Sequence, residues 1–147
     1  MRKYKLGLDI EKIDRIISRD MDANIMKAVG DKVTVSQAYV IDFMSNTDKE
    51  DIFQKDLEKQ FDLKRAAISL MLNNMEKNNL IKRVPVSEDA RLKKLVLTEK
   101  SIALADTITT AIDEIENTLL EDLTQEEIDN FYTVLNKMRN SLTKRKG

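Results

Sequence analysis

The sequence contains neither cysteine nor histidine among its 147 residues. Without cysteine, a disulfide, a thiolate metal site and thiol redox chemistry are all excluded. Without histidine, the chain lacks the usual general base of enzymes and the commonest transition-metal ligand. The sequence also contains no recognisable nucleophile–base pair or phosphate-binding loop. We therefore expect no enzyme activity, no catalytic residue, no metal site and no cofactor.

Glycine and proline are scarce, with three and one residues, which leaves little material for the turns of an all-β fold. No apolar run approaches the roughly 20 residues of a membrane-spanning helix. The first residues also lack the apolar core of a signal peptide. Hydrophobic residues make up 41% of the chain and charged residues 35%, which suits one core under a well-solvated surface. We expect a mainly α-helical, cytoplasmic protein that does not enter a membrane.

The most informative stretch is 62–97, where a helical pattern is followed by a β-hairpin pattern. Apolar residues recur at three- and four-residue steps, at Ile68, Met71, Leu72 and Met75. The opposite face is polar and carries Arg65, Ser69, Asn73 and Lys77. The pair Asn78-Asn79 ends this helix, because Asn tolerates the left-handed conformation of a helix C-terminus. The pattern predicts a helix over about 64–78 with a polar face turned outward.

Two β-prone runs follow, at 81–86 and 94–97, and the charged segment 87–93 separates them. They predict a hairpin with Arg91 at its tip. Positions 59–94 hold nine basic and four acidic residues, although the whole chain has a net charge of −1. The major groove of DNA, about 12 Å wide, admits a helix, and the minor groove, about 6 Å wide, admits an extended loop. The alternative is an ordinary solvated helix and hairpin.

Helices are also predicted on both sides of this stretch. A first helix covers 6–29, and a capping box at Thr34–Gln37 opens a second helix that runs to about Asn46. A third covers 52–61, and a tight turn at 62–64 then leads into the helix with the polar face. Two helices joined in this way form a helix-turn-helix.

Two further helices are expected after the hairpin, at about 99–122 and 125–142, and a capping box at Thr124–Glu127 opens the second of them. Their apolar stripes lie outside a minimal winged helix and need a cover. We expect dimerisation through residues 1–33 and 99–147, with residues 34–98 as the DNA-binding domain. For the first helix, packing on the chain's own core is the alternative.

The segments MEKNNLIKR and VSEDARLKKLVLTEKS resemble the end of the recognition helix and the wing of the MarR family of winged helix-turn-helix repressors. The resemblance is strongest at Asp89-x-Arg91 and over Leu95–Lys100. It implies a homodimeric transcription regulator that binds a pseudo-palindromic operator in double-stranded DNA. It also implies release by a small lipophilic or aromatic effector, and a supporting role for Asp89 in the wing.

Residue chemistry suggests how such a protein would contact DNA. Arg91 suits the minor groove, where narrow A·T tracts concentrate negative potential. Ser69 and Asn73 suit base edges, and Arg65 suits guanine or a phosphate. Phosphate contacts are expected from Lys64, Arg83, Lys93 and Lys94, although each of these lysines is as readily explained as a solvated side chain.

The chain departs from the family pattern at several positions. Lys64 and Ala66-Ala67 stand where serine or threonine is common at the start of the recognition helix, so a side-chain cap is expected to be missing there. Asn79 and Ser101 replace usual glycines. Asn79 accepts a left-handed conformation, whereas no consequence can be derived for Ser101.

An effector site is harder to place. The candidates Tyr39, Phe43 and Met44, with Tyr4 and Met21, are more simply explained as core residues. A different function also fits the pattern, namely a helical protein–protein interaction module without DNA binding, with the acidic helices after residue 98 as its surface. The dependence of DNA affinity on salt would separate the two functions.

Overall fold

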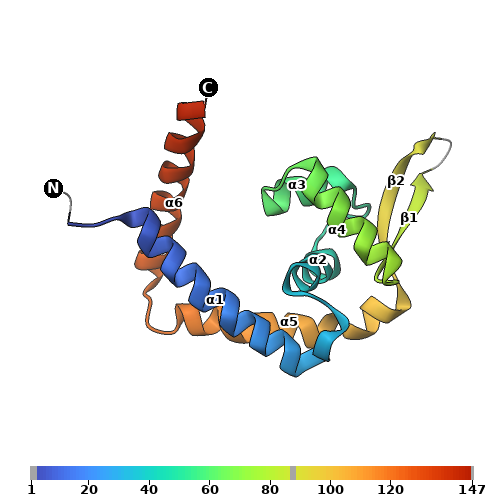
Figure 1. Cartoon of the computed structure of the whole chain (residues 1–147), viewed down its shortest axis with the longest axis horizontal. Helices are drawn as coiled ribbons and strands as arrows, with labels where there is room; N and C mark the ends of the chain where they lie inside the picture. Colours follow the sequence, from blue (N-terminus) through green and yellow to red (C-terminus); the bar gives the residue numbers. More distant parts are fainter. Residues whose placement is uncertain (1–2, 87–88, 147) are drawn as a thin grey trace. The chain divides into compact units, whose positions relative to one another are not determined.

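Apolar residues recur at helical spacing through most of the chain. The computed structural model of the chain describes residues 3–86 and 89–146, without the side chains of residues 89 and 90. The elements follow in the order α1 (Leu6–Val29), η1 (Gly30–Lys32), α2 (Val35–Asn46), α3 (Gln54–Phe61), α4 (Arg65–Lys77), β1 (Ile81–Val86), β2 (Asp89–Leu97), α5 (Glu99–Leu120) and α6 (Gln125–Lys146) (Figure 1). The prediction of a mainly α fold with a small β-hairpin wing is confirmed. Among the described helices, none combines the length and apolar character needed to cross a membrane.

The elements form two compact units, Met1–Ile112 and Asp113–Gly147, and their boundary falls inside α5. In the first unit, one core combines side chains from the helices and the hairpin: Met21, Ile25, Ile41, Leu57, Ile68, Leu72, Met75, Leu80, Ile81 and Ile108. In the second unit, α6 begins at the predicted capping box. Thr124 Oγ1 accepts from the Glu127 N–H at 3.1 Å, and the Glu127 carboxylate accepts from the Thr124 N–H at 3.2 Å. The helix runs on to Lys146 rather than ending near Leu142.

Local interactions set the end of α1 and the start of α2. Gly30 follows α1 with a φ of 68°, a backbone conformation that glycine adopts without a side-chain clash. Thr34 and Gln37 form the predicted capping box, with the Gln37 N–H donating to Thr34 Oγ1 at 3.2 Å. On α2, Val40, Ile41 and Met44 are buried, whereas Phe43, which the sequence also suggested as a core residue, is only half-buried.

The helix-turn-helix differs from the prediction at the start of α3. The helix begins at Gln54, and Ile52 instead pairs with Leu95 as an isolated antiparallel bridge. The Leu95 N–H donates to the Ile52 carbonyl at 2.7 Å, so the loop before α3 is fastened to the wing. After α3, Asp62 adopts the left-handed conformation with a φ of 50°, which makes the predicted tight turn into α4.

The hairpin is longer than predicted. Strand β2 begins at Asp89 rather than at Lys94, and it pairs antiparallel with β1 in the register Arg83↔Leu95. The register shifts between Pro85 and Val86, so residues 90–92 fall within an irregularity of the ladder. Such irregularities bend a strand and redirect its side chains. The prediction of a hairpin tip over 87–93 was therefore wrong for the described residues 89–93, because these residues belong to β2 and pairing with β1 resumes at Asp89.

The junction between the hairpin and α5 depends on Ser101, whose side chain is completely buried. Its hydroxyl donates to the Leu80 carbonyl at 2.7 Å and accepts from the Thr98 N–H at 3.0 Å. The Thr98 hydroxyl donates to the Asn79 carbonyl at 2.7 Å, and the Lys100 ammonium donates to the Asn78 carbonyl at 3.1 Å. The carbonyls that follow the end of α4 are thus satisfied by the start of α5, and this contact holds the base of the wing.

Replacing Ser101 with alanine should lower the free energy of unfolding by about 1–3 kcal/mol, because the Leu80 carbonyl and the Thr98 N–H lose their shorter hydrogen bonds and keep only the 3.4 Å bond to each other. Urea denaturation at matched protein concentration measures the change. Ser18→Ala, at an exposed position of α1, is the control and should change stability by no more than about 0.5 kcal/mol. Equal midpoints for the two variants would show that the Ser101 hydroxyl is dispensable.

Candidate nucleic-acid interface

The outward face of α4 carries the polar side chains that the sequence placed there. Its buried face consists of Ile68, Leu72 and Met75, and Met71 is half-buried. Arg65, Asn73 and Lys77 are exposed, and Ser69 is half-buried. Residues four apart on a helix share one face, so Arg65, Ser69 and Asn73 form a single row. At the start of the helix, Lys64 makes no side-chain cap within the described part of the chain, as expected.

Two of these polar side chains are held by neighbouring elements. Arg83 Nη1 on β1 donates to Asn73 Oδ1 at 3.0 Å and to the Glu76 carboxylate at 3.1 Å. Gln54 Nε2, at the start of α3, donates to Ser69 Oγ at 2.7 Å. In the row formed by Arg65, Ser69 and Asn73, the last two side chains are therefore held by contacts from α3 and the wing, which limits the rotamers that they sample.

A hollow of about 560 Å³ lies between the first turn of α3, the first turn of α4 and the wing. Four of the predicted DNA contacts line it, namely Arg65, Arg83, Arg91 and Lys93. Lys55 adds a fifth cation, and Glu58 is the acidic residue of the lining. Lys64, Ser69, Asn73 and Lys94 do not line it. Because five of the lining residues are cationic and one is acidic, the hollow attracts an anionic occupant.

Arg91 lies in β2, inside the irregular part of the ladder, and not in a loop as predicted. Its side chain is exposed, as are those of the next two residues, Leu92 and Lys93. The family resemblance implied that Asp89 supports the wing, but the side chain of Asp89 is not among the described ones. The wing therefore presents a short exposed run in which Leu92 stands between an arginine and a lysine.

The cation Lys94 is paired within the chain, since its ammonium lies 3.2 Å from Asp51 Oδ1. This ion pair joins the loop before α3 to β2, next to the Ile52–Leu95 bridge. Asp56 strengthens the same region, because its carboxylate accepts from the Phe53 N–H at 2.8 Å. That hydrogen bond lowers the pKa of Asp56, and the Lys49 ammonium at 3.1 Å lowers the pKa further.

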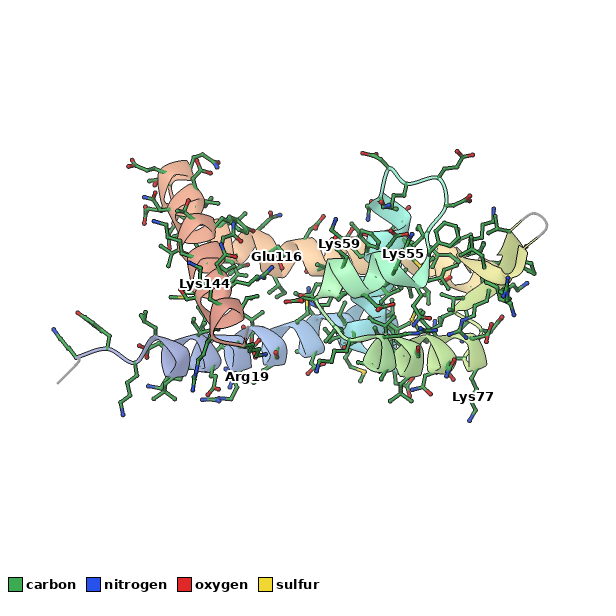
Figure 2. The ribbon with its side chains drawn as sticks, turned by 90° about the horizontal axis from the view of Figure 1, so that it is seen from above. Arg19, Lys55, Lys59, Lys77, Glu116 and Lys144 are labelled. Atoms are coloured by element: carbon green, nitrogen blue, oxygen red, sulfur yellow. The ribbon has the colours of Figure 1, made fainter. Side chains whose placement is uncertain are left out.

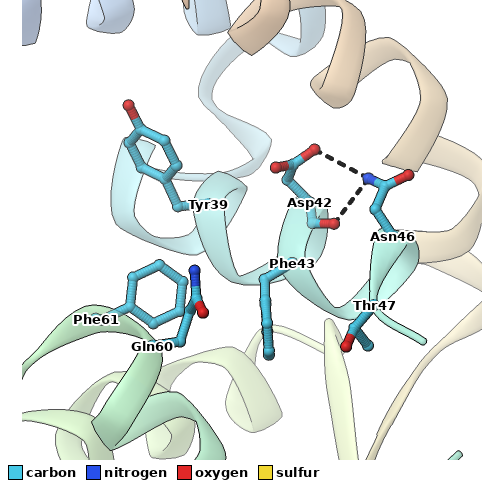
Figure 3. Close-up of a pocket in the computed structure, with 7 residues that line it drawn as sticks. All are labelled: Tyr39, Asp42, Phe43, Asn46, Thr47, Gln60 and Phe61. Atoms are coloured by element: carbon cyan, nitrogen blue, oxygen red, sulfur yellow. Dashed lines mark hydrogen bonds between the residues drawn. The ribbon is translucent and has the colours of Figure 1, made fainter. Parts of the chain in front are cut away.

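The aromatic candidates for an effector site separate into two groups. Tyr39 and Phe43 line a second hollow, of about 250 Å³, together with Asp42, Asn46, Thr47, Gln60 and Phe61 (Figure 3). Phe43 and Phe61 meet edge to face, with ring centroids 6.2 Å apart. On its polar side, the Asn46 amide donates to the carbonyl and the carboxylate of Asp42. Met44 does not line this hollow and is a core residue; Met21 is also in the core, and Tyr4 is exposed.

The sequence reasoning missed Gln54 and Lys55, and it gave Arg83 a different role. Figure 2 shows Lys55 and Lys59 on α3, and Lys77 at the end of α4. Nothing in the sequence pattern distinguishes Lys55 from Lys59, the other exposed lysine of α3. A signal did exist for Arg83, because it stands two residues after the buried Ile81 and so shares the strand face that packs on α4. Among the described residues, no group of three or more carboxylates is placed to hold a metal ion.

Comparisons with known proteins agree with this geometry. A model of the MarR family matches residues 32–92. The transcription regulator MarR from Oenococcus oeni is 26% identical, with a TM-score of 0.82, and the match covers 92% of this chain and 99% of that one. Staphylococcus aureus MepR in its DNA-binding conformation is 25% identical, with a TM-score of 0.79, and the match covers 95% of this chain and 99% of that one. The MepR chain of the S. aureus MepR–DNA complex is 24% identical, with a TM-score of 0.82, and the match again covers 95% of this chain and 99% of that one. No curated protein sequence matches the chain.

Proposed function

Because the chain belongs to the MarR family of winged helix-turn-helix regulators, we propose that it is a dimeric repressor that binds a specific sequence in double-stranded DNA. The observation that carries this proposal is the cationic hollow between α3, α4 and the wing, which Arg65, Arg83, Arg91 and Lys93 line together. The S. aureus relative was crystallised as a complex with DNA. The chain works as a non-enzymatic regulator on cytoplasmic DNA.

In this proposal α4 enters the major groove and the wing reaches the minor groove. The row formed by Arg65, Ser69 and Asn73 is polar and turned outward, which supports contact with base edges. Lys64 and Lys93 are exposed and suit phosphates, which fix the protein's register on DNA. Arg83 and Lys94 also face acidic partners in the chain, and they would bind phosphates while those ion pairs hold the wing.

Exposed apolar side chains support a dimer. The N-terminal half of α1 exposes Leu6, Ile10, Ile13 and Ile16, each by 46–58%. On α6, Phe131, Tyr132 and Leu142 are exposed by 59–63%. Apolar residues clustered in this way on two helices are typical of a protein–protein interface. We propose that residues 1–33 and 99–147 form the dimer and that residues 34–98 bind DNA, so that two subunits engage a pseudo-palindromic operator.

An effector completes the proposal. A small lipophilic or aromatic molecule would release the operator, and the hollow beside Tyr39 and Phe43 supports such a ligand because its lining includes the Phe43 and Phe61 rings. The polar groups of Asp42 and Asn46 at its edge would orient a ligand that carries one hydrogen-bonding group.

The test is a titration of the full chain with duplexes selected from random DNA, repeated over a range of salt concentrations. Four to eight phosphate contacts per dimer predict a slope of log K against log salt from about −4 to about −7. Fluorescence anisotropy measures the affinities. Lys93→Gln should make the slope less negative by about 1 for each phosphate contact removed. Lys137→Gln on α6 is the matched control and should leave the slope unchanged.

The competing function predicts a different outcome. A helical protein-interaction module would show neither sequence selection nor a steep salt dependence in this titration, because it would release no counterions from DNA. A flat response for the selected duplexes would therefore reject DNA binding and favour that alternative.

A further inference from the structure

The amide of Asn73 is held in one orientation by the wing. Its Oδ1 accepts from Arg83 Nη1 at 3.0 Å. A guanidinium has only donors, so the atom facing it must be the oxygen of the amide and not the nitrogen. The Nδ2 group then points away from Arg83, and among the described residues it has no hydrogen-bond partner. Asn73 is exposed, so its free group on the outer face of α4 is a donor.

Arg83 is itself fixed, which makes this orientation persistent. The same Nη1 atom lies 3.1 Å from the Glu76 carboxylate, and the Arg83 side chain is only 21% exposed. Asn73 and Glu76 are three residues apart and therefore adjacent on α4. The strand register places Arg83 opposite Leu95, in the regular part of the ladder. The guanidinium is held between two side chains of the helix by a charge-assisted bond.

Ser69 is restricted in a similar way. Gln54 Nε2 donates to Ser69 Oγ at 2.7 Å, so the serine oxygen is already an acceptor within the protein. The same Nε2 lies 3.5 Å from the Arg65 carbonyl, which also requires a donor and so supports this amide orientation. The serine hydroxyl retains one hydrogen for an outside partner. Arg65, the third member of the row, carries only donors by its chemistry.

We infer that α4 presents a row of donors and reads hydrogen-bond acceptors in the major groove. This inference rests on the proposed function. The acceptors available there are N7 and O6 of guanine, N7 of adenine and O4 of thymine. An unrestrained Asn commonly pairs with adenine through both its amide groups, using its oxygen to accept from the N6 amine. Arg83 takes one of the two lone pairs of that oxygen and holds the oxygen toward the wing. The Nδ2 donor is therefore the group of Asn73 that faces the base, so we expect the base to be recognised without its amine and cytosine to be disfavoured there.

The experiment first locates the base pair that Asn73 contacts. Duplexes are selected from random DNA with the wild-type chain and with Asn73→Ala, and the position whose preference disappears is the contact. At this position we expect guanine, thymine or adenine in the wild-type selection. Removing the acceptor, by 7-deazapurine or by 5-methyl-2-pyrimidinone for thymine, should weaken binding about tenfold. Replacing a selected adenine with purine, which lacks the N6 amine, should leave the affinity unchanged.

A second variant tests the role of Arg83. Arg83→Met removes the donor and frees the Asn73 oxygen, so adenine paired through its N6 amine, or cytosine, should gain about tenfold relative to guanine. Loss of a phosphate contact lowers the affinity for all sequences alike and does not alter this ratio. Thermal unfolding establishes that the variant is folded, and Lys82→Met, on the exposed face of β1, is the matched control with an unchanged base preference.

The outcomes separate this inference from the proposed function. Sequence-selective binding with cytosine at the Asn73 position, or with an adenine whose N6 amine is needed, overturns the inference and leaves DNA binding intact. An Asn73→Ala selection identical to the wild type overturns it as well. Absence of any salt-dependent binding overturns the proposed function and the inference together.

Discussion

Replacing Arg91 with alanine is expected to weaken operator binding by about 2–6 kcal/mol in a dimer, at about 1–3 kcal/mol for each subunit. This corresponds to a loss from about 30-fold to about 10⁴-fold in affinity. The reason is the position of the side chain, which is exposed and lies in the irregular part of β2. An arginine placed in a narrow minor groove gains from the concentrated negative potential of A·T tracts. Anisotropy titration with the selected duplex at fixed salt measures the loss.

Two further variants identify what Arg91 contributes. Arg91→Lys keeps the charge but loses the planar guanidinium, so it should recover only part of the affinity if the side chain enters the groove. A full recovery would indicate a simple phosphate contact. Arg19→Ala, an exposed arginine of α1 (Figure 2), is the matched control and should bind as tightly as the wild type. Unchanged affinity for Arg91→Ala would remove the wing from the interface.

The elements that the sequence predicted correctly are those set by local chemistry. The capping boxes at Thr34–Gln37 and Thr124–Glu127 involve residues three apart, so the pattern alone contains both partners. The turn at Asp62 and the left-handed Asn79, with φ values of 50° and 59°, are also local choices. In each case the interacting groups are close in the sequence, and no knowledge of the tertiary fold is needed.

The errors have the opposite origin. The sequence predicted that Ile52 belongs to α3, but Ile52 pairs with Leu95. These two residues are far apart in the sequence, so no local pattern predicts their bridge. The start of β2 was placed at Lys94 because three of residues 89–93 are charged, whereas an exposed two-stranded ladder tolerates charges on its outer face. Pairing between strands, rather than composition, decides where this hairpin ends.

The candidate site divides in the same way. The polar row on α4 follows from helical periodicity, so Arg65, Ser69 and Asn73 could be named in advance. Their hydrogen-bonding roles could not, because these depend on Gln54 and Arg83 from other elements. Ser101 had no derivable role for the same reason, since its partner Leu80 lies across the hairpin. Residue types give the chemistry of a site, and tertiary contacts decide which groups remain available.

Replacing Ile13 with glutamate is expected to convert the protein from a dimer to a monomer, and to weaken operator binding by about 10²–10⁴-fold. Ile13 is 51% exposed on α1, amid other exposed apolar residues, and a buried unpaired carboxylate at an interface is strongly unfavourable. Two half-sites then bind independently, because the second contact no longer benefits from the high effective concentration that the first provides. Light scattering should report the 17.0 kDa of one chain in place of twice that mass.

Controls within the chain separate loss of assembly from loss of folding or of DNA contact. Phe131→Glu, at a 59% exposed position of α6, should give the same monomer if both helices belong to the interface. Leu70→Glu places the same charge at a 64% exposed position of α4 and should keep the double mass, because residues 34–98 lie outside the proposed interface. A wild-type chain with the mass of a monomer would refute the dimer. A dimer that survives Ile13→Glu but not Phe131→Glu would assign the interface to α6 alone, and the half-sites would then be spaced by the C-terminal helices.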